Sequence, residues 1–284
     1  MHVALITGAE MAKPDPESYL LIPELNALDI KADLISWRAN CDWSQFDLVV
    51  IRTPWDYFLH LNEFLAWVKS VEKLTKVLNT SDILIWNSHK KYLQELSQAG
   101  VPVVPTHWVV EKENCIGLMK QITWPVVVIK PAVSIGAIGA LKGDSQDPQM
   151  QTHLNQLVMN GDVMIQPYLE SVSKEGELSL IYFDGVYSHA VCKKPQQGDY
   201  RVQDSYGGTN SVCEADEKAK LIGKQVLAYL SKVPLYARVD LVKDQKGWLL
   251  MELEAIEPEL FLPIAVGAAS RFAKAIYIKL DSSK

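Results

Sequence analysis

A lysine at the end of an apolar stretch is the first residue of this sequence that could do chemistry. Lys130 follows the apolar residues 125–129, and a bare ammonium is costly to bury, so its side chain must reach water, an acid or an anionic ligand. Residues 134–139 (Ser-Ile-Gly-Ala-Ile-Gly) could bring backbone N–H groups close to a phosphate. The alternative is a lysine whose ammonium simply extends to solvent. Lysine and loop together favour a nucleotide phosphate site.

Acidic residues near the end of the chain form a second candidate. Glu252 and Glu254 are two positions apart in an apolar segment, and alternate residues of a strand point to the same face. Asp240 would face them if its own segment pairs with theirs as a hairpin. Such a set of oxygen ligands suits Mg²⁺ or Mn²⁺, and the alternative is a solvated strand face. Glu257 and Glu259 continue the acidity, and we assign them to a loop or the surface.

Arg201 and the pair Gly207 and Gly208 form a third candidate. The planar guanidinium of an arginine can hold a carboxylate or a phosphate through two parallel hydrogen bonds. Consecutive glycines allow the backbone to approach a ligand closely. The alternative is a surface arginine followed by a turn.

The elements that must position these residues begin with alternating strands and helices. Short apolar runs at 3–7, 32–37 and 47–52 predict buried strands, and helical spacing at 16–28 and 61–74 predicts helices between them. Strands that alternate with helices are typical of βαβ units and a parallel sheet. The first third of the chain is therefore predicted to be α/β.

Antiparallel sheet is expected in the rest of the chain, which we predict to be α+β. Apolar runs at 126–130 and 163–168 predict strands around the glycine-bearing loop. The dipeptide Asp184-Gly185 between two apolar runs is a strong signal for a hairpin over 177–193, and a second hairpin is expected at 236–254. Helices are predicted at 88–99, 148–159, 214–231 and 260–279.

Composition limits the classes of protein that this chain can be. Its 284 residues suit about two domains or three small ones, and 48% hydrophobic with 22% charged residues is typical of a globular protein. A net charge of −6 argues against nucleic-acid binding through a basic surface, and no apolar run approaches a membrane span. Residues 1–8 have the character of a buried strand, so a cytoplasmic protein is expected. The wide spacing of Cys41, Cys115, Cys192 and Cys213 argues against structural zinc and a disulfide scaffold.

Specific motifs run through nearly the whole chain. They occupy residues 51–57 (IRTPWDY), 86–93 (WNSHKKYL), 101–106 (VPVVPT), 128–134 (VIKPAVS), 166–169 (QPYL), 188–191 (SHAV), 200–203 (YRVQ), 237–240 (ARVD) and 251–262 (MELEAIEPELFL). In these motifs the chain resembles the ATP-grasp superfamily, in the branch of glutathione synthetase and the RimK-type ligases. The resemblance implies an ATP-grasp fold with an N-terminal parallel α/β domain (1–88), a small central α+β lid domain (89–165) and a C-terminal antiparallel α+β domain (166–284).

The same resemblance implies an ATP site. Lys90 and Lys130 would hold the phosphates, and the loop 134–139 would cover them. The backbone of the hinge strand 166–169 would read the adenine, and Glu177 would bind the ribose. The ATP-binding residues expected on this basis are Lys90, Lys130, Ser134, Gly136, Gly139, Gln166, Tyr168, Leu169 and Glu177.

The resemblance also implies metal, substrate and catalytic residues. Asp240, Glu252 and Glu254 would hold Mg²⁺ or Mn²⁺, although many relatives carry asparagine where this chain has Glu254. Arg52 and Asp56 match positions at which related ligases hold substrate. The catalytic residues expected on this basis are Lys130, Arg201, Gly207 and Gly208, the last three facing an acyl phosphate.

The implied reaction uses ATP to join a carboxylate to a nitrogen nucleophile through an acyl phosphate. The closest likeness is to a ligase type that closes a ring within one small amino-acid-like molecule, whose ammonium Asp56 would bind. Trp55 and Tyr57 would wall that pocket or belong to the core. A homodimer is compatible with this interpretation, and neither nucleic acid nor membrane is expected as a partner. The alternatives are an intermolecular amino-acid or peptide ligase and a nucleotide-binding regulatory protein without turnover.

Overall fold

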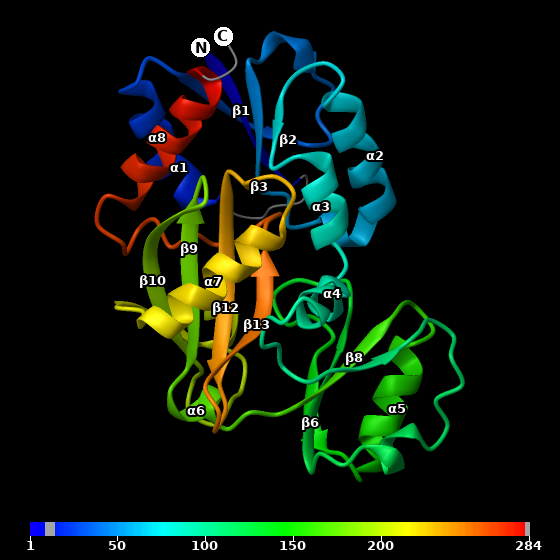
Figure 1. Cartoon of the computed structure of the whole chain (residues 1–284). Coiled ribbons are helices and arrows are strands. Elements are labelled where there is room, and N and C mark those ends of the chain that lie inside the picture. Colours follow the sequence, from blue (N-terminus) through cyan, green and yellow to red (C-terminus); the bar gives the residue numbers. More distant parts are fainter. Residues whose placement is uncertain (9–14, 282–284) are drawn as a thin grey trace.

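The structure of the chain, a computed structural model, describes residues 1–8 and 15–281. Within these ranges the strands form one parallel sheet followed by two antiparallel sheets (Figure 1). The predicted change from α/β in the first third to α+β in the remainder is thereby confirmed.

The first sheet is parallel and has the strand order β2-β1-β3-β4. Its strands are β1 (His2–Thr7), β2 (Lys31–Ser36), β3 (Leu48–Thr53) and β4 (Val77–Leu78). The helices of this part are α1 (Pro16–Asn26), α2 (Leu61–Val71), α3 (Ser81–Asn87) and the C-terminal α8 (Ala268–Asp281), with the 3₁₀ turns η1 (Trp43–Gln45) and η2 (Tyr57–His60). Figure 1 shows α1 and α8 on one side of the sheet and α2 on the other. Strand β3 is buried along its whole length because both faces of the sheet are covered.

The central sheet is antiparallel, with the order β5-β8-β6-β7. Its strands are β5 (His107–Val109), β6 (Val126–Pro131), β7 (Leu141–Asp144) and β8 (Val163–Pro167). Helix α5 (Pro148–Leu157) and the turn η3 (Leu118–Gln121) cover one face, where Ile129, Leu154 and Ile165 share a hydrophobic core. Val128 and Lys130 of β6 line a cavity together with Ser134 and Gly136 of the loop between β6 and β7.

The C-terminal sheet is also antiparallel and has the order β11-β10-β9-β12-β13. Its strands are β9 (Glu177–Phe183), β10 (Val186–Lys194), β11 (Thr209–Cys213), β12 (Tyr236–Lys243) and β13 (Trp248–Glu254). Helix α7 (Glu217–Tyr229) crosses one face of this sheet in Figure 1, and its residues share a core with β9 and β12. Smaller elements are α4 (Tyr92–Gln98), α6 (Ser171–Lys174) and η4 (Asp204–Tyr206). Both predicted hairpins are present, over β9–β10 and over β12–β13.

Two predicted helices begin later than expected. The helix predicted at 88–99 begins at Tyr92, and the one predicted at 260–279 begins at Ala268. The residues before α8 cannot be helical, because Leu260 and Leu262 donate their backbone N–H groups to the carboxylate of Glu17 and Phe261 has a φ of 55°.

The three-part division of the chain stays a proposal, and one of its boundaries needs a shift. The boundary expected after residue 165 falls inside β8, which pairs with β6 up to Pro167. We therefore place the end of the central unit after β8.

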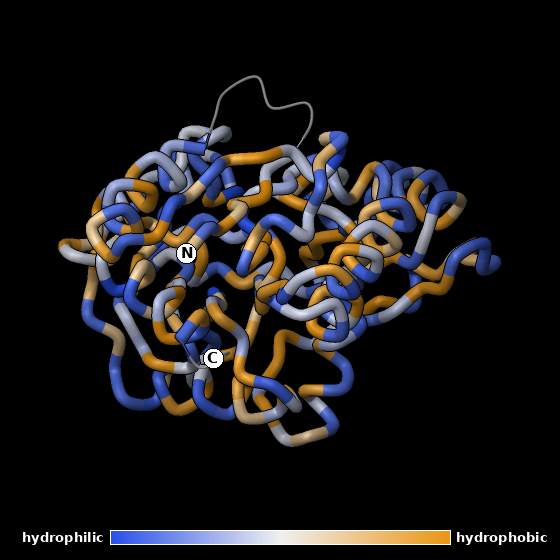
Figure 2. The backbone as a smooth tube through the Cα atoms, turned by 90° about the horizontal axis from the view of Figure 1, so that it is seen from above, coloured by the Kyte–Doolittle hydropathy of each residue, from blue (hydrophilic) through white to orange (hydrophobic). Residues whose placement is uncertain are grey.

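Hydrophobic stretches are short and alternate with polar ones along the chain (Figure 2). Among the described residues, no helix combines the length and the apolar character that crossing a membrane requires.

Candidate active site

A cavity of about 450 Å³ lies where the central and C-terminal sheets meet the loop after β3. It brings together most of the residues that the sequence analysis selected. Those that line it are Lys90, Lys130, Ser134, Gly136, Gln166, Tyr168, Leu169, Glu177, Arg201, Asp240, Glu252 and Glu254. Gly139, Gly207, Gly208, Arg52 and Asp56 are not part of its wall.

Strand β13, which carries two of the predicted metal ligands, is held in place by side chains from distant helices. The side chain of Asn87, at the end of α3, donates to the backbone oxygen of Leu253 (2.8 Å) and accepts from the N–H of Ala255 (2.8 Å). The hydroxyl of Tyr92, on α4, donates to the oxygen of Leu253 (2.8 Å) and accepts from its N–H (3.0 Å). These bonds fix the free edge of β13 and hence the direction of its acidic side chains.

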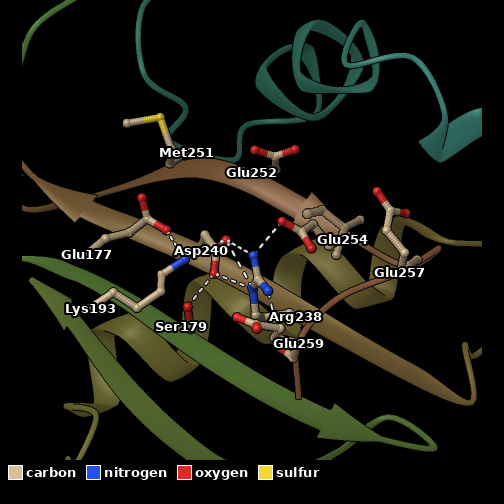
Figure 3. A network of polar contacts seen from close by, with 12 residues as sticks. Glu177, Ser179, Lys193, Arg238, Asp240, Met251, Glu252, Glu254, Glu257 and Glu259 are labelled. Atoms are coloured by element: carbon tan, nitrogen blue, oxygen red, sulfur yellow. Dashed lines mark hydrogen bonds and ion pairs between the residues drawn. The ribbon is translucent and has the colours of Figure 1, made fainter. Parts of the chain in front are cut away.

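The acidic residues of this sheet are accompanied by two buried basic side chains (Figure 3). Asp240 lies opposite Glu252 in the β12–β13 ladder, and it accepts hydrogen bonds from Arg238 Nη2 (2.9 Å) and Lys193 Nζ (3.1 Å). Arg238 also pairs with Glu254. Burial alone would raise the pKa of Asp240, but Arg238 and Lys193 hold it below its usual value. The carboxylates therefore coexist through ion pairs within the protein.

The acids of this sheet share one face because buried basic side chains lie among them. Arg238 and Lys193 supply the positive charge, and no group of three or more acidic, histidine or cysteine side chains in the described part of the chain is arranged to hold a metal. The sequence held a signal for Arg238, which is two positions before Asp240 and shares its strand face. It held none for Lys193, because a regular hairpin would place Cys192 opposite Glu177, and a β-bulge in β10 brings Lys193 there instead.

Lys90 and Lys130 reach the cavity with different surroundings. Lys90 Nζ donates to the backbone oxygen of Ser134 (2.8 Å) in the loop and pairs with Glu252 (3.0 Å). Lys130 Nζ has only the sulfur of Met251 at 3.9 Å, and it forms no ion pair with any described residue. Burial lowers the pKa of Lys130, and the nearby carboxylates, Glu252 first, offset only part of this effect. The cavity side of β6 thus presents a cation that an anion would stabilise.

Arg201 lines the cavity, but its guanidinium is already engaged. Its Nε and Nη2 donate to the carboxylate of Asp199 at 3.1 and 2.7 Å, and its plane lies 3.7 Å from the ring centroid of Tyr206. The hydrogen bonds from Arg201 lower the pKa of Asp199. Gly208 is required by local packing instead of by a ligand, because a Cβ there would lie 2.1 Å from the oxygen of Val202. The expectation that the glycine pair faces an acyl phosphate is not met in this conformation.

The hinge strand and the ribose position lie at one end of the cavity. Gln166 belongs to the cavity wall, and its buried side chain donates to Thr106 Oγ1 (2.9 Å). The ring of Tyr168 is covered by the ammonium of Lys142 at 3.6 Å. Glu177 forms an ion pair with Lys193, and burial raises the pKa of this carboxyl group.

The two expected substrate residues of the first domain lie behind the cavity wall. Arg52 is fully buried between the rings of Tyr236 and Phe272 and pairs with Glu17 at 3.0 Å. Asp56 accepts a hydrogen bond from Trp37 Nε1 (2.9 Å). Neither side chain belongs to the cavity wall, and their contact with a substrate stays a prediction.

A different acid from the expected ones lines the cavity near the first domain. Glu257, which the sequence analysis assigned to a loop or the surface, belongs to the wall together with Trp55. Trp55 Nε1 donates to the backbone oxygen of Glu257 (3.0 Å), and burial, followed by the carboxylate of Glu257, raises the pKa of the Tyr57 hydroxyl. The motif 251–262 contained this acid, but only the folded chain shows what it faces.

Comparison with known proteins places the whole chain in one family. The family model "D-cycloserine synthetase DcsG, N-terminal domain" matches residues 3–79, and the model "prokaryotic glutathione synthetase, ATP-grasp domain" matches residues 93–259. The chain is 31% identical to the cycloserine biosynthesis protein DcsG of Streptomyces lavendulae over 98% of both chains. It is 23% identical to the glutathione synthetase of Neisseria meningitidis over 85% of this chain and 77% of that one.

Solved structures give the same picture. The crystal structure of D-cycloserine synthetase DcsG superposes with a TM-score of 0.90 at 29% identity, over 99% of this chain and 100% of the other. The D-alanine–D-alanine ligase of Bacillus anthracis shares the fold, with a TM-score of 0.70 at 16% identity over 100% and 98% of the two chains.

The chain therefore belongs to the ATP-grasp family and is an ATP-dependent, ADP-forming carboxylate–amine ligase. Within that family it is similar along its whole length to D-cycloserine synthetase.

Proposed function

We propose that this ligase closes a ring within one small amino-acid-like molecule. The γ-phosphoryl group of ATP is transferred to the substrate carboxylate, and ADP leaves. A nitrogen of the same molecule then attacks the acyl carbon, so that a C–N bond forms and phosphate leaves with a carboxylate oxygen while the nitrogen loses a proton. An intramolecular nucleophile needs no second amine site, because tethering already provides a high effective concentration.

The observation that carries this proposal is one continuous cavity with opposite charges on its walls. The ammonium of Lys130 faces it from β6, while Glu252 and Glu257 face it from β13 and the segment that follows. A molecule with both a carboxylate and a basic nitrogen is complementary to such a site. Similarity to D-cycloserine synthetase over 98% of both chains, including the N-terminal domain, supports the ring-closing type.

We assign the nucleotide to the part of the cavity between the lysines and the hinge. Lys90 and Lys130 would neutralise phosphate oxygens, and the loop 134–139 would cover them and exclude water. The backbone of residues 166–169 would contact the adenine, and Glu177 would bind the ribose after release from Lys193. These residues line the cavity beside charged side chains, and this location supports the assignment of each to the nucleotide.

The oxygen donors of β13 fit a hard cation such as Mg²⁺ or Mn²⁺. The side chains of Glu252 and Glu254 are 24% and 22% exposed toward the cavity, whereas Asp240 is buried and already paired. We propose that Glu252 and Glu254 hold the ion together with nucleotide phosphates, since Mg²⁺ prefers shared ligation. Such an ion, when bound, supplies charge neutralisation at the transferred phosphoryl group. Asp240 would orient Arg238 and Lys193 beneath them.

An ATP-consuming reaction supports a cytoplasmic location, where ATP is supplied.

The finer assignments of substrate and metal are tested by activity. The protein is incubated with ATP, Mg²⁺ and O-ureidoserine as the single substrate, and ADP and the ring product are measured, the latter by mass spectrometry. Ring product without any added amine is expected. ADP release that requires a separate amine would reject ring closure in favour of an intermolecular ligase.

A further inference from the structure

The loop after β3 contacts Glu257 through two aromatic residues. Trp55 Nε1 donates to the backbone oxygen of Glu257 at 3.0 Å. Tyr57 is 4% exposed and packs against Phe64 with ring centroids 5.4 Å apart, and burial, followed by the carboxylate of Glu257, raises the pKa of its hydroxyl. The segment after β13 thus presents one acidic group to the end of the cavity beside Trp55.

Three carboxylates of this wall, Asp204, Glu257 and Glu259, form no ion pair within the described residues, and Glu257 is the one of the three that is not exposed. Glu177 and Asp240 share Lys193, and Glu254 pairs with Arg238. Within residues 1–8 and 15–281, Glu257 forms no ion pair, and Figure 3 shows no contact from the Arg238 network to it.

The charge around Glu257 remains negative. Lys90 offsets part of it, but the ammonium of Lys90 is bound to Glu252 and to the loop. Burial, followed by the neighbouring carboxylate of Glu254, raises the pKa of Glu257 well above its usual range. A cation at this end of the cavity would therefore be stabilised by charge and by geometry.

We propose that Glu257 is the specificity-determining residue that binds the ammonium group of the substrate, with Tyr57 as its positioning residue. This inference rests on the proposed function, which requires an amino-acid-like ligand in the same cavity. It replaces the expected role of Asp56, whose carboxylate accepts from Trp37 and is not part of the cavity wall. With the ammonium at Glu257, the substrate carboxylate can extend toward Lys130 and the nucleotide phosphates.

The test is a binding measurement with two probes, made on the full chain in the presence of a non-hydrolysable ATP analogue and Mg²⁺. The probes are O-ureidoserine and its desamino analogue, 3-(ureidooxy)propanoate, titrated by calorimetry. Wild type should prefer the amino probe. Glu257→Gln should weaken binding of the amino probe by about 10–100-fold, as expected for losing a hydrogen bond between charged groups, with little change for the desamino probe.

Controls separate this role from a structural one. Glu257→Asp keeps the charge and should keep the preference, and Tyr57→Phe should lose part of it. Glu217→Gln removes the same charge from the exposed face of α7 and should change nothing. Unchanged affinity for the ATP analogue shows that each variant is folded.

The outcomes distinguish the two proposals. If wild type forms ring product but Glu257→Gln keeps the wild-type preference, the role of Glu257 is rejected and the function stands. If no ring product forms but the preference depends on Glu257, ring closure is rejected and the ammonium site stands. If wild type does not prefer the amino probe, the ammonium site is rejected.

Discussion

Lys90 and Lys130 face the same cavity, but removing each has different consequences for the folded chain. Lys90 bridges the loop oxygen of Ser134 and the carboxylate of Glu252, so it also links three segments. Lys130 has no such partner among the described residues and is available to a ligand.

Lys130→Ala should therefore weaken ATP binding and lower the turnover rate by roughly 10²–10³, by analogy with the loss of one oxyanion-hole donor, without lowering the melting temperature. Lys90→Ala should weaken ATP binding as well, but it should also lower the melting temperature because Glu252 loses its partner. Calorimetric titration with nucleotide and thermal unfolding measure the two effects. The exposed Lys120→Ala is the control, and wild-type ATP affinity in both cavity variants would contradict the assignment.

Glu17 is the second residue whose environment makes a measurable prediction. Its carboxylate accepts from the N–H groups of Leu260 (2.9 Å) and Leu262 (3.0 Å) and pairs with Arg52. Burial, opposed by Arg52, raises the pKa of Glu17 from 4.5 to about 6. The folded state therefore binds more protons than the unfolded state between these pH values, so this group favours folding less as the pH rises.

The free energy of unfolding of wild type relative to Glu17→Gln should fall by about 1.5 kcal/mol between pH 4.5 and 6.5. Urea denaturation of both proteins across this range measures the difference and removes the contribution of other titrating groups. A difference that rises with pH would show that the ion pair with Arg52 outweighs burial.

At the scale of elements, the β12–β13 ladder organises the acidic wall. A β-bulge between Asp240 and Leu241 shifts the register, so that Asp240 lies opposite Glu252. Without the bulge, the pairing of Leu241 with Leu250 would continue with Met251 opposite Asp240. The two glutamates of β13 would then point to the other face of the sheet.

Arg238 makes this crowded ladder possible, because it pairs with both Asp240 and Glu254. Arg238→Leu should lower the free energy of unfolding by about 3–5 kcal/mol, since it leaves buried carboxylates uncompensated. Arg38→Leu, which breaks the exposed pair with Glu63, should cost less than about 1 kcal/mol. Urea denaturation compares the two, and equal losses would contradict a special role for Arg238.

At the scale of the whole molecule, the cavity exists because all three parts contribute to it. The first domain supplies Trp55, the central sheet supplies Lys130, and the C-terminal sheet supplies Glu252. Asn79, beyond β4, donates to the backbone oxygens of Tyr236 (3.0 Å) and Ala255 (2.8 Å), which joins the first domain to the C-terminal sheet. A ligand in the cavity therefore contacts several units at once.

A non-hydrolysable ATP analogue with Mg²⁺ should raise the free energy of unfolding by about 2.7 kcal/mol at a hundredfold excess over its Kd. Mg²⁺ alone should not, because the carboxylates are paired with basic side chains instead of forming an open metal cluster. Thermal unfolding with each ligand separately is the measurement, and stabilisation by Mg²⁺ alone would contradict this account.

Asp240→Asn should abolish turnover while the chain stays folded. Wild-type magnesium-dependent activity in this variant would contradict the role of Asp240.

Local rules were sufficient for much of the fold and for the choice of cavity residues. Period-2 and period-3.6 spacing indicated the strands and most helices, and Asp184-Gly185 indicated its hairpin, because these signals act between near neighbours in the chain. The sequence alone likewise indicates that a lysine at the end of an apolar strand is exposed. It also indicates that acids two positions apart in a strand share one face. Lys130, Glu252 and Glu254 were found in this way and do line the cavity.

Only the tertiary structure determines which of these side chains are available to a ligand in the cavity. The bulges in β10 and β13 place Lys193 opposite Glu177 and Asp240 opposite Glu252, and a bulge depends on packing beyond the hairpin itself. Arg52 is buried in an ion pair with Glu17, which lies more than thirty residues away in the chain. Glu257 lines the cavity beside Trp55, which donates to its backbone oxygen from about two hundred residues earlier in the chain. Burial and charge pairing depend on contacts between distant segments. The spacing of residues within one segment gives no information about such contacts.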